Sequence, residues 1–341
     1  MLFEQATGGV WTLKLVAALS LSLLAWTDAR AADPIALSFP LKCELGTTCF
    51  VQSYVDHDLS NGSRDYQCGS RTYDGHDGTD IRVLDLGMQR AGVEVLAAAT
   101  GRVTGARDGM ADISVRTVGK AAIAGKECGN GVVLEHENGW RTQYCHMAKG
   151  SVRVKTGDRV TEGQTIGLVG LSGDTEFPHL HITVRQAGTV VDPFAFGPAL
   201  DSCNSGGQSL WANALRAKLN YQPREVLNYG FSSVPPTMEL IESGDIKNSL
   251  PNRQSAALVA YIRVIGLQKG DEQVLAVSNP DGSPFSEYAP PPLESNKAQS
   301  FISAGKRLRA PAWPAGTYAV TYRVMRNGGE LLRKTFDIKL D

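Results

Sequence analysis

The sequence predicts an all-β protein, and three observations support this expectation. Residues 73–200 consist of short β-type segments such as VEVLAAA, NGVVLEHE and HLHITVRQ, broken by glycine-containing turns. No long helical apolar period competes with them. Residues 208–341 continue with strand-like segments at regular spacing, separated by turns such as Asn279-Pro280-Asp281-Gly282. The chain has 341 residues, so we expect about two domains.

Residues 1–32 have the features of a secretory signal peptide. Lys14 precedes the short apolar run LVAALSLSLLAW, and small residues follow around Ala31 and Ala32. Because the run is short for a membrane span, cleavage after Ala31 or Ala32 is favoured over an uncleaved anchor or a buried core helix. No other stretch has the character of a transmembrane helix. We therefore expect an exported chain, periplasmic or secreted, with no stable membrane span after cleavage.

The mature chain divides into an extension, two β domains and a linker. Residues 33–72 contain three cysteines and many small polar residues, and we expect them to wrap over the next domain. Residues 73–200 form the first β domain, and 201–207, DSCNSGG, form a linker. Residues 208–341 predict a β-sandwich of immunoglobulin-like type. Since this last part contains no histidine, we expect it to be a binding or spacer module.

All six cysteines follow the predicted cleavage site, and an even number in an exported chain indicates disulfides. Spacing does not fix the connectivity. The first expected pair closes a small loop, the second bridges the strands of a predicted hairpin, and the third is the pair that remains. These pairs are Cys43 with Cys49, Cys128 with Cys145, and Cys68 with Cys203. A cysteine metal site is disfavoured because the chain has no Cys-x-x-Cys pair.

The formal net charge is −1, so nothing in the composition indicates nucleic-acid binding or an electrostatically held membrane partner. The segment FPHLHITV is more informative. On a strand, His179 and His181 lie on one face while Leu180 points into a core. One such histidine is more often a polar residue on a solvent face. Two on one face, in a chain with only six histidines, predict a metal or catalytic site.

Partners for this pair occur earlier in the chain. YDGHDGTD offers His76 and Asp80, and QYCHM offers His146. A catalytic zinc needs three protein ligands and a position for water, and His76, Asp80 and one residue of the later pair would supply two nitrogens and one oxygen. The two remaining histidines would position or deprotonate the water and stabilise an oxyanion. There is no His-Glu-x-x-His helix, so the thermolysin arrangement is excluded.

GHDGTD, QYCHM and HLH, in that order with glycine-rich β segments between them, resemble the motifs of the lysostaphin/LytM-type zinc metalloendopeptidases. DRVTEGQTIGLVG is similar to that family's hairpin before the last motif, and the match spans about Tyr73 to Phe196. The resemblance implies an antiparallel β-sheet domain with its site in a groove. It also implies one zinc per chain and hydrolysis of peptide cross-links or stems of bacterial peptidoglycan.

The resemblance also implies roles for individual residues. His76, Asp80 and His181 would be the zinc ligands, and His146 and His179 the catalytic pair, with the choice of base between these two left open. We expect His136 and Tyr144 to be structural residues near the site, and Trp140 to pack or to stack on substrate. His57 is expected to be a surface or loop histidine, with a second metal beside Asp56 and Asp58 as the alternative.

Two segments are longer than in the compact family pattern, LDLGMQRAGVEV and RDGMADISVRTVGKAAIAGKE, and they would line the groove walls. The bond that is cut is therefore open. We expect a D-alanyl–diaminopimelate cross-link, with a glycine bridge or a non-wall protein as alternatives. In some relatives an N-terminal segment covers the zinc, and the same role for the extension before His76 is a disfavoured alternative.

Two other functional classes remain as alternatives. The first is a catalytically silent module of the same fold that controls other cell-wall hydrolases, which is disfavoured because all five site positions are filled. The second is a lipoyl- or biotinyl-type carrier domain, since VKTGDRVTEGQTIGLVG resembles its hairpin. TQYCHM offers no lysine for modification, and an exported chain is in the wrong compartment for such a carrier.

Overall fold

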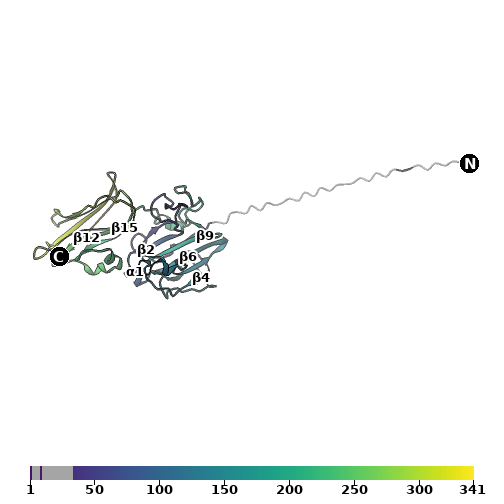
Figure 1. Cartoon of the computed structure of the whole chain (residues 1–341), viewed down its shortest axis with the longest axis horizontal. Helices are drawn as coiled ribbons and strands as arrows, with labels where there is room; N and C mark the ends of the chain where they lie inside the picture. The colour runs from purple at the N-terminus through teal and green to yellow at the C-terminus, as the bar shows by residue number, and fades with distance from the viewer. Residues whose placement is uncertain (2–7, 10–33) are drawn as a thin grey trace. The chain divides into compact units, whose positions relative to one another are not determined.

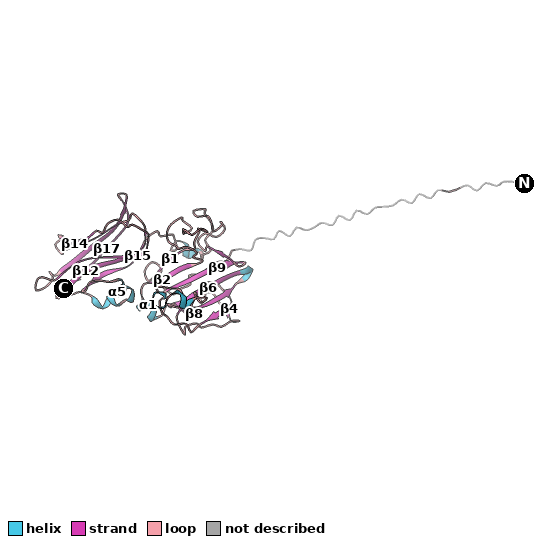
Figure 2. Cartoon of the chain, viewed as in Figure 1, coloured by secondary structure: helices cyan, strands magenta, loops and turns pink. Residues whose placement is uncertain are grey.

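The computed structural model describes residues 1, 8–9 and 34–341 (Figure 1). The predicted signal peptide, residues 1–32, lies almost entirely outside the described residues. Residues 34–341 form one compact unit, in which strands dominate and the helices are short (Figure 2). The described residues include no helix with the length and apolarity needed to cross a bilayer.

An antiparallel sheet of eight strands carries the first part of this unit. Its strand order is β1-β2-β9-β6-β5-β4-β7, and β10 pairs with β9 off this path. β3 and β8 form a separate antiparallel pair. The bounds are β1 (Cys49–Ser53), β2 (Thr79–Val83), β3 (Glu94–Leu96), β4 (Gly101–Arg107), β5 (Asn130–Glu135), β6 (Trp140–Met147), β7 (Arg159–Val160), β8 (Thr165–Leu168), β9 (His179–Gln186) and β10 (Thr189–Val191).

The two faces of β9 explain how the sheet builds a site. Leu180, Ile182 and Val184 are at most 1% exposed and belong to the hydrophobic core. His179 and His181 alternate with them and so point to the opposite face, as expected for a strand. On the neighbouring strand β2, Asp80 lies opposite His181. A buried core on one face therefore fixes the register that places polar side chains together on the other.

Short helices occupy the connections, including the two long segments noted in the sequence. LDLGMQRAGVEV contains α1, whose first turn is capped because the Asp85 carboxylate accepts a hydrogen bond from the Met88 amide (2.7 Å). RDGMADISVRTVGKAAIAGKE contains α2 and α3. The helices are α1 (Leu86–Ala91), α2 (Val115–Val118), α3 (Lys120–Ile123), α4 (Asn213–Arg216) and α5 (Met238–Ser243), with 3-10 turns η1 (Glu137–Gly139) and η2 (Asp245–Ser249).

Two further antiparallel sheets make up the C-terminal part. One has the order β11-β12-β15 and the other β14-β13-β16-β17. Buried side chains of both sheets, such as Ile262 and Tyr322, belong to one hydrophobic cluster. The predicted β-rich C-terminal region is thus present, whereas its immunoglobulin-like character stays a prediction. The bounds are β11 (Glu225–Ser232), β12 (Ala257–Leu267), β13 (Glu272–Ser278), β14 (Pro284–Tyr288), β15 (Lys297–Arg307), β16 (Gly316–Arg326) and β17 (Gly329–Leu340).

The segments expected to be extension and linker both bond to the first sheet region. β1 lies within 33–72 and is the edge strand beside β2. The segment 201–207 is tied back to residue 68 by a disulfide. His57 lies in a loop, but it is buried (1% exposed) rather than on the surface, because its ring bonds the Asp192 carboxylate (2.9 Å) and the Ser202 carbonyl (2.8 Å). The division into domains at 72, 200 and 207 stays a prediction.

All six cysteines are joined in disulfides, in the three pairings considered from the sequence: Cys43–Cys49, Cys68–Cys203 and Cys128–Cys145. The three loops differ greatly in length, with sequence separations of 6, 135 and 17 residues. A longer loop restricts the unfolded chain more when it is closed.

We predict that removing the longest bridge costs the most stability. Cys68→Ala with Cys203→Ala opens a loop of 135 residues and should lower the free energy of unfolding by about 5 kcal/mol. The matched control, Cys43→Ala with Cys49→Ala, opens a loop of 6 residues and should cost about 2 kcal/mol. Urea denaturation of the mature protein and both double variants measures the difference, and equal losses would contradict the prediction.

Candidate metal centre

His76 approaches the sheet from the loop that precedes β2. Gly75 before it has a positive φ of 73°, a conformation that glycine adopts without strain. The His76 ring lies under the Tyr73 ring, with centroids 4.3 Å apart. Its Nδ1–H donates to the Tyr54 carbonyl (2.6 Å), which leaves the lone pair of Nε2 pointing at Asp80.

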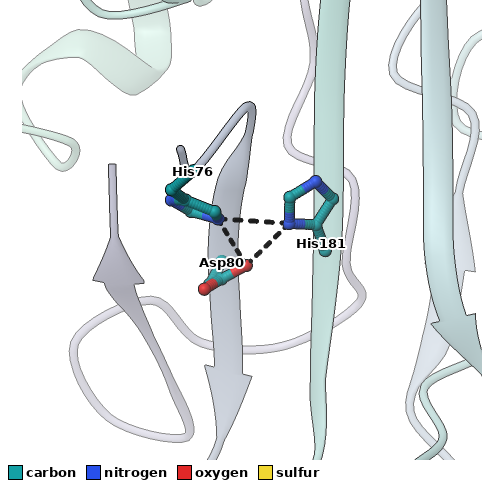
Figure 3. Close-up of side chains that lie close together, drawn as sticks. All are labelled: His76, Asp80 and His181. Atoms are coloured by element: carbon teal, nitrogen blue, oxygen red, sulfur yellow. Dashed lines mark hydrogen bonds and ion pairs between the residues drawn. The ribbon is translucent and has the colours of Figure 1, made fainter. Parts of the chain in front are cut away.

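Asp80 and His181 complete a triangle with His76, drawn in Figure 3. Asp80 Oδ1 lies 3.1 Å from His76 Nε2 and 2.9 Å from His181 Nδ1, and the two nitrogens are 3.2 Å apart. Because Asp80 and His181 are paired across β2 and β9, the sheet itself sets their separation. In the described chain this is the one group of His, Cys, Asp and Glu side chains with the spacing of metal ligands.

The outer nitrogen of His181 is held by polar groups at the mouth of the site. Nε2 lies 3.0 Å from the Thr183 hydroxyl and 3.2 Å from Asp77 Oδ1. The Arg185 guanidinium in turn donates to Asp77 (2.6 Å). This arrangement orients Nδ1 of His181 inward, as outer-shell partners do for histidine ligands in metal sites.

The donor atoms fit a zinc ion. Since the outer nitrogens of His76 and His181 are anchored, each neutral ring aims a lone pair at a carboxylate oxygen that also carries lone pairs. Such a convergence is repulsive unless a cation, either a proton or a metal ion, lies between the donors. Ligands about 2.0–2.1 Å from a tetrahedral zinc are about 3.3 Å from each other. The separations of 2.9–3.2 Å are close to that value.

His146 reaches the same centre from β6 through an irregular backbone. The register of β5 and β6 shifts at this point, and His146 has a positive φ of 62°. Its amide donates to the Cys128 carbonyl (2.8 Å), next to the Cys128–Cys145 disulfide. The ring Nδ1–H donates to the Ser172 carbonyl (2.8 Å), so Nε2 is free to accept a proton. A strained residue held in this way is typical of a functional site.

His179 is anchored in the same manner. Its Nδ1–H donates to the Phe177 carbonyl (2.9 Å), and its Nε2 lies 3.4 Å from Asp80 Oδ1. The His146 and His179 rings have centroids 4.7 Å apart. Both rings are buried, 6% and 4% exposed, and they flank the triangle without belonging to it.

Burial and charge shift the pKa values of these groups. For Asp80, burial favours the neutral acid, but the charges of His76 and His179 and hydrogen bonds from His179 and His181 outweigh it and hold the pKa well below its ordinary value. For His181, burial opposes the charged ring, but hydrogen bonds to Asp77 and Asp80 raise the pKa to about 9. Burial and the neighbouring His179 and His181 hold the pKa of His146 well below its ordinary value. The centre thus favours a positive charge next to Asp80 and a neutral ring at His146.

The metal triangle opens into a cleft of about 330 Å³. Its lining includes His181, His146, Tyr73 and Arg185, together with the disulfide-bonded Cys128 and Cys145. Asp77, Thr183 and the three carbonyls that anchor the rings are not among the residues that the sequence patterns indicated. Asp77 could have been identified because it is adjacent to His76 in the first motif. Backbone carbonyls could not, because they do not depend on residue type.

The remaining predicted residues lie outside the cleft. His136 Nδ1–H donates to the Thr100 carbonyl (2.9 Å) and its Nε2 accepts from the Thr142 hydroxyl (2.8 Å), whose oxygen lies 3.0 Å from the Tyr144 hydroxyl. Tyr144 also accepts from the Ala98 amide (2.8 Å). Trp140 is 2% exposed and packs against Phe196. These contacts are structural and support β6, the strand that carries His146.

The antiparallel sheet therefore carries a buried His-Asp-His group with the donor set and spacing of a candidate metal centre. Residues 74–193 match the family model described as "Peptidase family M23". This segment is an M23 family domain of the lysostaphin/LytM type, as the motifs predicted, and the candidate ligands all lie within it.

Several curated proteins share this segment. The chain is 39% identical over 77 residues to "Cell division protein DipM" of Caulobacter vibrioides, 42% identical over 64 residues to "Peptidoglycan DD-endopeptidase ShyA" of Vibrio cholerae, and 35% identical over 101 residues to "DD-carboxypeptidase/endopeptidase Mpg" of Neisseria meningitidis. The matches cover 22%, 19% and 28% of this chain. They cover only 12%, 14% and 23% of those relatives.

Solved structures with a partial likeness include a zinc-containing peptidase from Vibrio cholerae, at 25% identity and a TM-score of 0.27, covering 43% of this chain and 39% of that one. The catalytic domain of lysostaphin from Staphylococcus simulans also has 25% identity and a TM-score of 0.27, with coverage of 41% and 85%. At these TM-scores the likeness carries no argument about the whole chain.

We predict that the four histidines of the centre separate into two groups by zinc content. His76→Ala and His181→Ala each remove a ligand and should weaken zinc binding by at least about 100-fold, since even outer-shell changes cost about 10–100-fold. His146→Ala and His179→Ala should keep the wild-type zinc content. His136→Ala, outside the cleft, is the matched control. Elemental analysis after dialysis against a chelator measures the content, and full zinc in His181→Ala would refute the ligand assignment.

Proposed function

We propose that this chain is an exported zinc-dependent endopeptidase that hydrolyses peptide bonds in peptidoglycan stems or cross-links. The observation that supports it best is the convergence of His76, Asp80 and His181 on one point, with the inner nitrogens of His146 and His179 beside it. This constellation lies in an M23 family domain and opens into a cleft.

His76 Nε2, Asp80 Oδ1 and His181 Nδ1 are the atoms that would hold the metal. Bound there, zinc supplies a Lewis acid for the scissile carbonyl and a water of lowered pKa. The chain's contribution is to fix the donors. The Tyr54 carbonyl orients His76, the β2–β9 register orients Asp80, and Asp77 with Thr183 orients His181.

His146 and His179 would move the protons. Burial holds the pKa of His146 low, so its ring is neutral at neutral pH and can accept a proton at Nε2. A ring that has accepted this proton can donate it to the leaving amine. The partner ring can stabilise the charge that develops on the carbonyl oxygen. Both rings are anchored through Nδ1 on a carbonyl, so we assign the two roles to the pair jointly.

The substrate class is proposed from the relatives' names. Two of them are described as peptidoglycan DD-endopeptidase and as DD-carboxypeptidase/endopeptidase. The chain spans less than a quarter of the length of either, so their specificity is not transferred outright. A D-alanyl–diaminopimelate cross-link is the bond we propose, with a glycine bridge as the alternative.

The three disulfides bear on the cellular compartment of the protein. Three disulfides and a cell-wall hydrolase domain indicate a protein outside the cytoplasm. With the predicted signal peptide, this favours the periplasm or secretion. The alternative function, a silent module that regulates other hydrolases, would be favoured by a missing ligand or catalytic histidine. All five positions are filled here, which favours activity.

We predict metal-dependent digestion of isolated peptidoglycan. The mature protein, loaded with zinc, should release peptide fragments that mass spectrometry identifies, and a chelated sample should release none. His146→Ala should keep its zinc and lose activity by about 100-fold or more, because proton transfer contributes about 10²–10⁴-fold to such rates.

Two outcomes would count against the proposal. Full activity of His146→Ala would exclude its catalytic role. A zinc-loaded protein that cuts neither sacculi nor soluble cross-linked muropeptides would favour the regulatory alternative.

A further inference from the structure

Arg82 is a buried guanidinium directly beside the catalytic pair. It lies on β2, opposite His179 on β9, and is 1% exposed. Its Nη1 donates to the Gln52 side-chain oxygen (2.8 Å) and lies 3.4 Å from that of Gln299. Within residues 34–341 its Nε has no hydrogen-bond partner. The guanidinium is thus fixed from two sides but incompletely satisfied.

Phe177 contacts both this guanidinium and the His179 ring. The Arg82 Cζ atom is 4.7 Å from the Phe177 ring centroid, a cation–π contact. The same Phe177 ring contacts the His179 ring, with centroids 4.6 Å apart and planes inclined by 31°. The Phe177 carbonyl also accepts the His179 Nδ1–H (2.9 Å). Phe177 therefore contacts the His179 ring by its side chain and anchors Nδ1 by its carbonyl, with the Thr175 hydroxyl 3.1 Å from the same nitrogen.

Residues of the C-terminal sheets help to hold Arg82 in place. Gln299, on β15, donates to Glu242 Oε1 of α5 (2.6 Å) while its oxygen faces Arg82. Gln52, on β1, donates to the Ala298 carbonyl of β15 (3.0 Å). The side chain that anchors Arg82 from the first sheet is thus itself bonded to β15.

Stability alone gives a poor reason for this arrangement. Removing a guanidinium from water is costly, and an apolar side chain of similar volume often serves folding as well or better. Here the buried charge has an unpaired N–H and meets the ring that contacts His179. A planar cation on a ring face has a defined geometry, which favours a role in holding that ring in place.

We propose that Arg82 is a positioning residue for His179, that it acts through the Phe177 ring, and that Gln299 of β15 helps to hold it. This inference rests on the proposed function, because it requires His179 to be catalytic. The C-terminal β region then belongs to the catalytic unit, beyond the binding or spacer role expected from the sequence.

The first test replaces Phe177, the residue that contacts both Arg82 and His179. Phe177→Leu removes the ring but keeps the carbonyl and the apolar character, and Phe177→Tyr restores a ring. With a soluble cross-linked muropeptide as substrate, Phe177→Leu should lower kcat about tenfold, since small misplacements of a catalytic group cost up to about 100-fold. KM, zinc content and Tm should stay close to wild type, and Phe177→Tyr should recover most of kcat.

Arg82 and its partner Gln299 are tested separately. Arg82→Lys keeps the charge but loses the planar contact, and Gln299→Ala removes the anchor on β15. Both should lower kcat with zinc retained, Gln299→Ala by a smaller factor. Lys297→Ala, an exposed residue on the same strand, is the matched control and should have no effect.

Three results would overturn the inference: wild-type kcat in Phe177→Leu, equal losses in Phe177→Leu and Phe177→Tyr, or a loss that follows zinc content. If Arg82→Lys does not fold, the comparison of Phe177→Leu with Phe177→Tyr still tests the inference. His179→Ala separates this inference from the proposed function: if that variant keeps full hydrolysis, the catalytic pair is wrong whatever the Phe177 variants do.

Discussion

The whole site depends on one carboxylate oxygen. Oδ1 of Asp80 has the inner nitrogens of His76, His179 and His181 within 3.4 Å. Asp80, His76 and His179 are buried, and the His181 side chain is 12% exposed. The lone pairs of this oxygen and the three nitrogens repel one another at such distances unless a cation lies between them. The register of β2 and β9, fixed by the apolar residues on the other face, is what forces them together. The metal centre is in this sense a consequence of how the sheet buries its core.

Backbone carbonyl groups orient the histidine rings around this oxygen. The carbonyls of Tyr54, Ser172 and Phe177 each accept an Nδ1–H, which leaves Nε2 of His76, His146 and His179 free of these anchors. Nε2 of His76 and of His179 lies within 3.4 Å of Asp80 Oδ1. These carbonyls come from the end of β1, the segment before β9 and the residue two before His179. The N-terminal extension thus supports a ligand through Tyr54, whatever other role it has.

Much of this could be predicted from residue types and spacing. The His-x-His strand and the His-x-x-x-Asp loop leave direct patterns, and the cysteine spacings indicated pairings that the structure also has. The carbonyl anchors could not be predicted, because every residue has a carbonyl and only the fold selects three of them. The burial of His57 was missed because its partner, Asp192, is distant in sequence. Arg82 and Phe177 were missed because neither residue type indicates a site until the strands are aligned.

The most direct test of the central claim is anomalous diffraction at the zinc edge from crystals of the zinc-loaded mature protein. The arrangement described here predicts one zinc peak per chain, about 2.0–2.2 Å from His76 Nε2, an Asp80 oxygen and His181 Nδ1. His146 and His179 should lie beside the metal with Nδ1 still on their carbonyls. A peak bound by His146 or His179 in place of His76 or His181, or no peak at Asp80, would contradict it.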